Sequence, residues 1–542
     1  MSTLSPSPPP EQADPVDTGR LDGASPARLI VVLAAIVLYS EIASIQYIMV
    51  GAALQKLTKT FASVGGNITW AMIIIGLIGA AATPLLGKLS DIFGKKRFFL
   101  ICGVLFIAGC LVDALTSDWT VFLIGRGLQA FAIASQMIAY GLIRDLMPRK
   151  YIPIGLGATA AGIGFGSILA PLLGGWLVDN FDWRAMFWFL GGFVLLMTPI
   201  VMFFVPESKL RVKDRFDPIG AVLLPVGLLL TLLYLDKGQD WGWGRITSYG
   251  YLVGGLALLA LFFVVETRVS RPIMDMKLLL HPRVSITLVM AMFGTMLIAS
   301  ESFALGYMTQ TPNAAQLKET VVGGVLAQAK QTTGISLPPS VVHVVLDPGY
   351  GYGSGFSLLQ YALHIGVWSG VVALIVGPLG GYLARRFGGR LPAVIAFVVI
   401  SVMGVAFALA STHYTWQLFF ALAVLTGVGF ALFYAAVPNL LVEAVPAEQQ
   451  GISAGMLGVV LNIGAAVALA VFTALLNANP VKARIDVLGH AAVQPIPQVF
   501  GDHGYAAGFW VMTGCTVVAL VIALFMRHGR KPATGGADVP AD

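Results

Sequence analysis

The stretch Pro84-Leu-Leu-Gly87-Lys-Leu-Ser-Asp91-Ile-Phe-Gly94 ends a long apolar run and is followed by the basic cluster Lys95-Lys96-Arg97. A similar stretch, Pro378-Leu-Gly-Gly381-Tyr-Leu-Ala-Arg385-Arg-Phe-Gly388, ends another apolar run in the second part of the chain. When the same helix-end pattern occurs once in each part of a chain, it indicates an internal repeat, and many membrane transporters are built from such repeats. The chain is therefore predicted to contain two related halves.

The composition places both halves in a membrane. Of the 542 residues, 57% are hydrophobic and only 11% are charged, whereas a soluble domain has about 25% charged residues. No charged residue occurs between Tyr151 and Val178, or between Leu391 and Val442. Since about 20 apolar residues suffice for one transmembrane helix, these stretches indicate a polytopic helical membrane protein. The composition excludes a soluble enzyme, a nucleic-acid-binding protein and a disordered protein.

Charge gaps and turn signals predict an all-α membrane protein of fourteen transmembrane helices, in two six-helix halves with two inserted linker helices. The halves cover residues 28–206 and 283–528, and the linker pair lies within 207–282. The predicted spans are 29–54, 67–90, 98–117, 120–142, 153–178, 183–204, 216–236, 248–268, 283–310, 356–384, 391–412, 416–442, 450–478 and 506–527.

The connecting segments predict the topology. Residues 1–27 and 529–542 form polar tails, the first of them rich in proline and predicted to be disordered. The larger share of the 33 lysines and arginines falls on the side of the tails, which predicts that both termini are cytoplasmic. Two long loops, 311–355 and 479–505, are then outside. The similar phrases that end them either cap the start of the following helix or belong to an external lid or partner site. The three cysteines lie in predicted helices, so we expect neither a disulfide nor a metal site.

The segment from Gly87 to Arg97 resembles the signature Gly-x3-Asp-Arg/Lys-x-Gly-Arg/Lys-Arg/Lys of the major facilitator superfamily, with Ile92 in place of one cation. The resemblance implies a cytoplasmic latch that holds the outward-facing state. Asp91 is expected to cap a helix terminus of its own half or to pair with a loop cation. The predicted latch consists of Gly87, Asp91, Gly94, Lys95, Lys96 and Arg97.

Helix 153–178 contains Gly166-Ser-Ile-Leu-Ala170-Pro171-Leu-Leu-Gly174-Gly175. This stretch resembles the antiporter signature Gly-x3-Gly-Pro-x2-Gly-Gly, with alanine replacing one glycine. Small residues let helices approach closely in lipid, and proline bends a helix. The resemblance implies export against a proton gradient. The alternative is a glycine-rich packing face that any transporter could have.

Helix 120–142 contains Ile124-Gly-Arg126-Gly-Leu-Gln129-Ala, which resembles a third signature of the family, Arg-x2-Gln-Gly. An arginine among apolar neighbours almost always faces a cavity or a partner. The alternative is that Arg126 snorkels to the outer surface, because it lies near the start of its helix. Asp113, near the outer end of the preceding helix, is predicted to be solvated rather than functional.

Two glutamates lie inside predicted spans. Ser40-Glu41-x5-Tyr47 in the first helix matches Ser300-Glu301-x5-Tyr307 in the first helix of the second half. A carboxyl group removed from water favours its protonated form, so each glutamate could bind and release a proton as access switches. Each could instead act only as a protonated hydrogen-bond donor. Related exporters tend to carry an aspartate where Gln46 stands, so either the proton-carrying role has moved to Glu41 or the coupling differs from theirs.

The resemblance to fourteen-helix drug:proton antiporters implies a proton-coupled exporter of lipophilic small molecules, cations among them, which works by alternating access in a bacterial cell membrane. The predicted site for protons and substrate consists of Glu41, Tyr47, Arg126, Gln129, Glu301 and Tyr307. The expected partners are the substrate, protons and membrane lipids, and the expected state is a monomer without cofactor or enzymatic activity. An exporter of a lipid, glycolipid or pathway metabolite is an alternative, and a non-transporting receptor or assembly partner is another.

Overall fold

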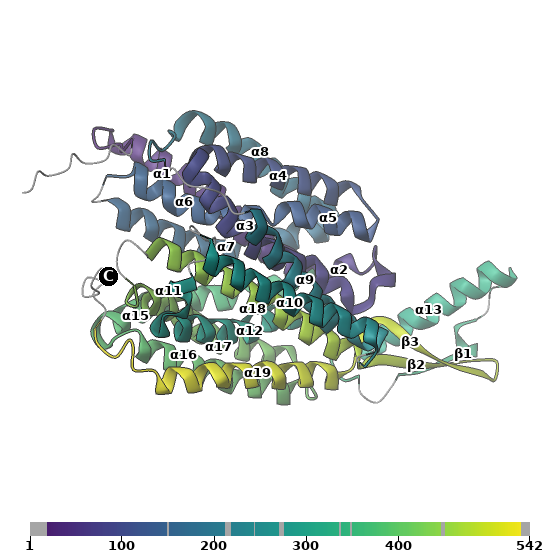
Figure 1. Cartoon of the computed structure of the whole chain (residues 1–542). Coiled ribbons are helices and arrows are strands. Elements are labelled where there is room, and N and C mark those ends of the chain that lie inside the picture. Colours follow the sequence, from purple (N-terminus) through teal and green to yellow (C-terminus); the bar gives the residue numbers. More distant parts are fainter. Residues whose placement is uncertain are drawn as a thin grey trace, which may run out of the picture.

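A computed structural model describes residues 19–532, except 149–150, 212–217, 243, 270–275, 335, 337, 347–349 and 446–449. Long helices form one bundle, with both ends of the described chain on one side and a small sheet on the other (Figure 1). We call the side of the chain ends the terminal face and the side of the sheet the distal face. The predicted tails 1–27 and 529–542 lie largely outside the described residues.

Among the described residues, the first half contains eight α-helices and the short 3₁₀-helix η1 (Ala62–Thr69). Several of its predicted spans are interrupted: one is broken at Glu41, and another at Ala130 and Phe131. The α-helices are α1 (Pro26–Ser40), α2 (Ile42–Leu57), α3 (Trp70–Phe93), α4 (Lys95–Leu115), α5 (Trp119–Gln129), α6 (Ala132–Leu146), α7 (Ile152–Asn180) and α8 (Arg184–Phe204).

Two helices, α9 (Pro218–Trp241) and α10 (Ile246–Arg268), lie between the two halves along the chain. They pack on each other, and α9 also packs on α3 and α18. The second half begins after them and contains a π-helical turn, η4 (Ala362–Gly366), between α14 and α15. Its bundle helices are α11 (Met276–Leu280), α12 (Pro282–Gln310), α14 (Leu358–Tyr361), α15 (Val367–Phe387), α16 (Arg390–Ala410), α17 (Trp416–Val442), α18 (Gln450–Asn477) and α19 (Asp502–Phe525).

The helices have the length and surface of membrane spans. Within the described part of the chain, 11 helices are long and apolar enough to cross a membrane, or 12 if the bent pair Asn67–Ala80 and Leu85–Phe93 is one span. Large apolar side chains such as Leu196, Phe203 and Ile375 are more than 70% exposed on the bundle, as expected for surfaces that face lipid. The protein is a mostly helical multi-pass membrane protein, and the count of fourteen spans stays a prediction.

The two long loops predicted at 311–355 and 479–505 are not only loops, because they pair into an antiparallel three-stranded sheet of order β1-β2-β3. This sheet and the helix α13 project beyond the bundle on the distal face (Figure 1). Leu488 and Gly489 both have positive φ angles and close the β2–β3 hairpin, as tight hairpin turns require. The elements are α13 (Ala314–Thr333), the 3₁₀ turn η3 (Pro339–Val341), β1 (Val342–Leu346), β2 (Pro480–Val487) and β3 (His490–Phe500).

Candidate functional site

Glu41 lies at the break between α1 and α2 and is only 4% exposed. Its side chain faces Gly162 of α7, where an added Cβ would lie 2.8 Å from the Glu41 Cγ. A larger residue at this crossing would require the Glu41 side chain to move. Within the described part of the chain, Glu41 Oε2 is buried and has no hydrogen-bond partner. The break therefore holds a carboxyl group with a free acceptor between two helices of the first half.

Glu301 is also buried, in α12 of the second half. It precedes the distal end of α12, Gln310, by nine residues, whereas Glu41 precedes the distal end of α2, Leu57, by sixteen. At about 1.5 Å per residue, Glu301 lies roughly 10 Å closer to the distal face. One described neighbour that interacts electrostatically with Glu301 is Tyr361 of α14. The two glutamates thus have different neighbours, and their common cavity stays a prediction.

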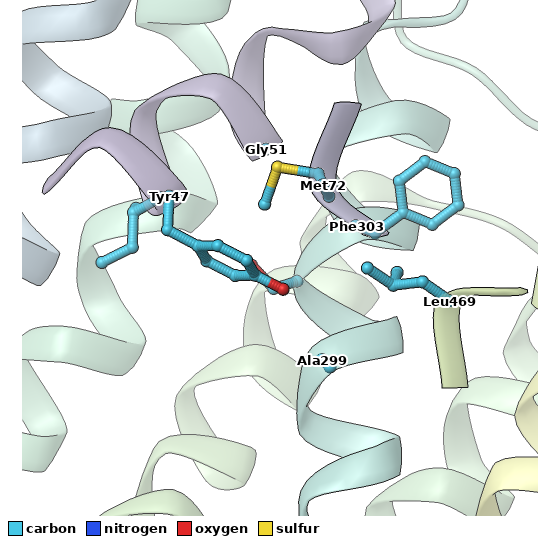
Figure 2. Close-up of a pocket in the computed structure, with 8 residues that line it drawn as sticks. Tyr47, Gly51, Met72, Ala299, Phe303 and Leu469 are labelled. Carbon is cyan, nitrogen blue, oxygen red and sulfur yellow. The ribbon is translucent and has the colours of Figure 1, made fainter. Parts of the chain in front are cut away.

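Tyr47 lies where the two halves meet. Figure 2 shows its ring reaching from α2 toward a small gap bordered by Met72, Leu469 and Ala299. The cavity has a volume of about 20 Å³, which is room for a single water molecule. At this place the halves are in contact almost without free volume.

Tyr307 lies elsewhere, although its sequence context repeats that of Tyr47. Its hydroxyl donates to the Gln498 carbonyl of β3 at 3.0 Å, and the Gln498 amide donates to the Phe61 carbonyl of the first half at 2.8 Å. Gln498 has a positive φ of 61°, a conformation that is unusual for a residue other than glycine. Tyr307 therefore helps to hold the distal sheet across the two halves.

Further hydrogen bonds between the halves also lie at the distal ends of the helices. The hydroxyls of Thr69 and Thr473 are 2.7 Å apart, and the Gln310 amide donates to the Ala52 carbonyl at 2.7 Å. The Asp179 carboxylate accepts from the backbone N–H groups of residues 358 and 359 at 3.2 and 2.8 Å. These bonds close the distal face in this conformation.

The glycines predicted as the antiporter motif lie at close helix crossings of α7. A Cβ on Gly166 would lie 3.3 Å from Ile45 of α2, and one on Gly174 would lie 2.7 Å from Met49 of the same helix. A Cβ on Gly175 would lie 2.6 Å from the Leu359 Cα of α14. Gly174 thus packs within the first half, whereas Gly175 packs across the two halves.

Pro171 lies inside α7, as predicted. Its ring lies next to Gly366, at the end of the π-helical turn of the second half. Such turns are frequent at functional sites. The proline and the turn therefore bring two irregular helix segments, one from each half, into contact.

The predicted latch is paired within the first half. Asp91 Oδ1 lies 2.7 Å from Lys95 Nζ, and this nitrogen lies 3.0 Å from Asp145 Oδ2. Ser208 donates to the Asp145 carboxylate at 2.7 Å. Asp91 thus pairs with a cation of its own loop, one of the two roles expected for it. In this conformation the Asp91 charge is compensated by Lys95 of the first half, and no residue of the second half is needed for it.

The two glycines of the latch differ in their surroundings. Gly94 has a φ of 127°, and a Cβ there would lie 2.9 Å from Glu207 Oε2. The Glu207 carboxylate accepts from the backbone N–H groups of Lys96 and Arg97 at 2.9 and 3.2 Å, so it caps the first turn of α4. A Cβ on Gly87 would meet no atom within 4 Å. Among the described residues, no close helix contact requires a glycine at position 87 in this conformation.

Arg126 is fully buried, which excludes the alternative that it snorkels to the surface. Its Nε donates to the Ala71 carbonyl of α3 at 3.0 Å. Its Nη1 donates to Gln46 Oε1 of α2 at 3.0 Å and also to Gln129 Oε1. The arginine therefore joins α2, α3 and α5 inside the first half, and its partners on these atoms are neutral oxygens.

The prediction that Asp113 is solvated is wrong. Asp113 is fully buried, and the Gln129 amide nitrogen donates to its Oδ2 at 2.9 Å. The reason is the close approach of α4 and α5 at two glycines. A Cβ on Gly109 would lie 2.5 Å from the Gly125 carbonyl oxygen, and one on Gly125 would lie 2.0 Å from Asp113 Oδ1. Position in the sequence alone did not show that α5 covers the end of α4.

Comparison with known proteins supplies the family. The sequence model of the Major Facilitator Superfamily matches residues 36–364 and 324–539. The multidrug resistance protein Stp of Mycobacterium tuberculosis is 26% identical over 444 residues, which are 80% of this chain and 73% of that protein. A triacylglyceride transporter of Mycolicibacterium smegmatis is 28% identical over 469 residues, or 82% and 74% of the two chains.

The fold is also similar to that of solved transporters. The crystal structure of a peptide transporter, POT, in complex with sulfate superimposes with a TM-score of 0.58 at 15% identity, and the match covers 94% of this chain and 95% of that one. At this identity the likeness shows the fold alone.

Proposed function

Because the chain belongs to the major facilitator superfamily, we propose that this transporter is a proton-coupled antiporter that exports lipophilic small molecules, cations among them. It is a membrane transporter and not an enzyme. The proposal further places both termini in the cytoplasm of a bacterial cell, so that the distal face is the outer face. The working unit is a monomer that needs no cofactor besides the proton gradient.

The observation that carries the proposal is the unpartnered, buried Oε2 of Glu41 at the break between α1 and α2. A buried ionised carboxylate with one oxygen left without a hydrogen bond is costly, so such a group binds a proton or a cation. The distal face is closed in this structure, so access from the terminal face would let Glu41 exchange its proton for cytoplasmic substrate. When the halves rearrange, the released substrate is replaced by an incoming proton.

Glu41→Gln tests this role because it keeps the size of the side chain and removes the titratable proton. The assay uses purified protein in lipid vesicles with an imposed pH gradient, and follows substrate-induced proton release with a pH-sensitive dye. We expect Glu41→Gln to lose this release and uphill export, while it still binds neutral substrates. Glu301→Gln is expected to be milder, with a shifted pH optimum or cation preference.

Glu319→Gln is the matched control, because Glu319 is exposed on α13 and the chemical change is the same. It should leave proton release unaltered. Undiminished proton release by Glu41→Gln would show that this glutamate is only a structural hydrogen-bonding group.

The class of cargo needs its own comparison. One relative is named for multidrug resistance and another for triacylglyceride transport, at similar identity. The vesicle assay is therefore run with a lipophilic cation, a neutral drug and a fluorescent acylglycerol. Flux of the first two alone supports the drug exporter, and flux of the acylglycerol alone supports the lipid exporter. A receptor without transport activity would show no flux of any of them.

A further inference from the structure

The buried cluster of Asp113, Gln129, Arg126 and Gln46 lies outside the Glu41 site and joins three helices of the first half. All four side chains are fully buried. Gln129 connects the two charges, since its Nε2 donates to Asp113 and its Oε1 accepts from Arg126. The cluster is therefore one hydrogen-bonded chain from α4 through α5 to α2.

Three atoms of this cluster are buried without a hydrogen-bond partner in the described part of the protein: Asp113 Oδ1, Arg126 Nη2 and Gln46 Nε2. One of them is a carboxylate acceptor, and the other two are donors. Buried polar atoms are almost always satisfied in native structures. A cluster that leaves both acceptors and donors free can change its protonation or its partners when the helices move.

The charge balance of the cluster depends on a single proton. The charged and titratable groups that face it among the described residues are Cys110 of α4 and Tyr47 of α2, and both are ordinarily neutral. With Asp113 ionised, the Arg126 charge is compensated through Gln129. With Asp113 protonated, the cluster carries one positive charge, and neutral oxygens of Ala71, Gln46 and Gln129 accept hydrogen bonds from the Arg126 guanidinium.

We propose that Asp113 is a second proton-binding residue of this transporter. Its buried carboxyl group, whose Oδ1 has no partner among the described residues, holds a proton in the distal-closed state, and it releases this proton and balances Arg126 when the cluster opens to water. The proposal rests on the proton-coupled function proposed above and extends it. The physical link to Glu41 is α2, because Glu41 directly precedes this helix and Gln46, which accepts from Arg126, lies on it five residues later.

Geometry also shows why the site can respond to helix movement. Asp113 and Arg126 lie on different helices, and glycines 109 and 125 set the distance between these helices. A small separation of α4 from α5 would break the bond between Gln129 and Asp113. Water would then hydrate the carboxyl group, which favours its ionised form and the release of its proton.

The test counts protons without any substrate. Purified wild-type protein and variants are titrated in detergent between about pH 5 and pH 9, a range in which an exposed aspartate stays ionised. We expect Asp113→Asn to bind about one proton fewer than the wild type over this range. Asp118→Asn is the matched control. Asp118 is exposed at the start of α5, and asparagine caps a helix equally well.

Asp113→Asn leaves Arg126 without its compensating charge, and this variant could fail to fold. The double variant Asp113→Asn/Arg126→Gln removes both charges. We expect it to recover the melting temperature of the wild type while still lacking the proton. If wild type and double variant bind equal numbers of protons, Asp113 keeps one protonation state, its role is structural, and the proposal is wrong.

This outcome is distinct from failure of the proposed function. The titration needs no substrate and no transport, so it remains decisive if vesicles show no proton-linked flux. Conversely, if flux is coupled and Glu41→Gln abolishes it, an unchanged titration of the Asp113 variants would refute only the second site.

Discussion

Gly175→Ala is expected to shift the balance between the two conformations of the transporter. The added Cβ would lie 2.6 Å from Leu359 Cα and 2.8 Å from Leu359 N, whereas unstrained carbon contacts are about 3.5–4.0 Å. The neighbour is backbone, and Asp179 holds it by two hydrogen bonds. Helices α7 and α14 must therefore separate by about 1 Å for the distal face to stay closed.

Overpacking of this kind costs about 1–3 kcal/mol. The cost falls on the distal-closed state, because Gly175 and Leu359 belong to different halves. The ratio of distal-open to distal-closed molecules should then rise by about 5- to 150-fold.

Two other glycine-to-alanine substitutions, used as controls, separate this effect from general damage to packing. Gly174→Ala would press on the flexible Met49 side chain inside the first half. Gly192→Ala in α8 would meet no atom within 4 Å. Neither should change the balance of conformations.

The assay is pulsed electron paramagnetic resonance in lipid vesicles, with spin labels at positions 120 and 412 in a background without the three native cysteines. Both positions are exposed at distal helix ends, one on each half. We expect Gly175→Ala to increase the long-distance population, and the two controls to match the unsubstituted protein. If Gly175→Ala leaves the distances unchanged, or Gly174→Ala shifts them equally, the contact across the halves does not govern closure.

The remaining predictions concern the terminal face. Asp91→Asn removes an ion pair between the half-exposed Asp91 and Lys95, so it should lower the free energy of unfolding by no more than about 1 kcal/mol. Substrate affinity should stay within a few-fold of the wild type while the transport rate falls strongly. Loss of substrate binding with continued transport would contradict the role of Asp91 in the latch. His528, beyond the end of α19, hydrogen-bonds with the Leu440 carbonyl, and burial lowers its pKa from the usual value of 6.5. Since the undocked segment binds the proton more readily, docking of residues 526–532 is strongest above about pH 6.5 and weakens as the pH falls through this value. Histidine NMR titration should give His528 a midpoint below that of a free histidine peptide, and an equal midpoint would show that the segment is not docked in solution.

The sequence by itself determined the membrane class and the family. Long charge-free stretches are a local property, and lipid permits only structures that satisfy their backbone hydrogen bonds internally. The motif from Gly87 to Arg97 has fixed spacing, and it identified the family that the match over residues 36–364 and 324–539 shows. The sequence also placed Arg126 and Glu301 in helices, where the structure has them buried, whereas Glu41 is buried at a helix break that the sequence did not predict.

Which helix covers which side chain was decided only by the tertiary structure. Asp113 seemed solvated from its place near a helix end, but α5 buries it and Gln129 bonds to it. Adjacent glycines 174 and 175 look equivalent in the sequence, and only the rotation of α7 directs one toward α2 and the other toward α14.

The distal sheet illustrates the same limit at longer range. Its strands come from two loops that are more than a hundred residues apart, and β1 pairs with β2 from Val342 opposite Val487 to Leu346 opposite Ala483. The pattern of a single short strand does not name its partner. Hydropathy depends on each segment alone and can be read from the sequence, whereas strand pairing, helix rotation and buried charge pairs depend on contacts between distant segments, which form only when the bundle packs.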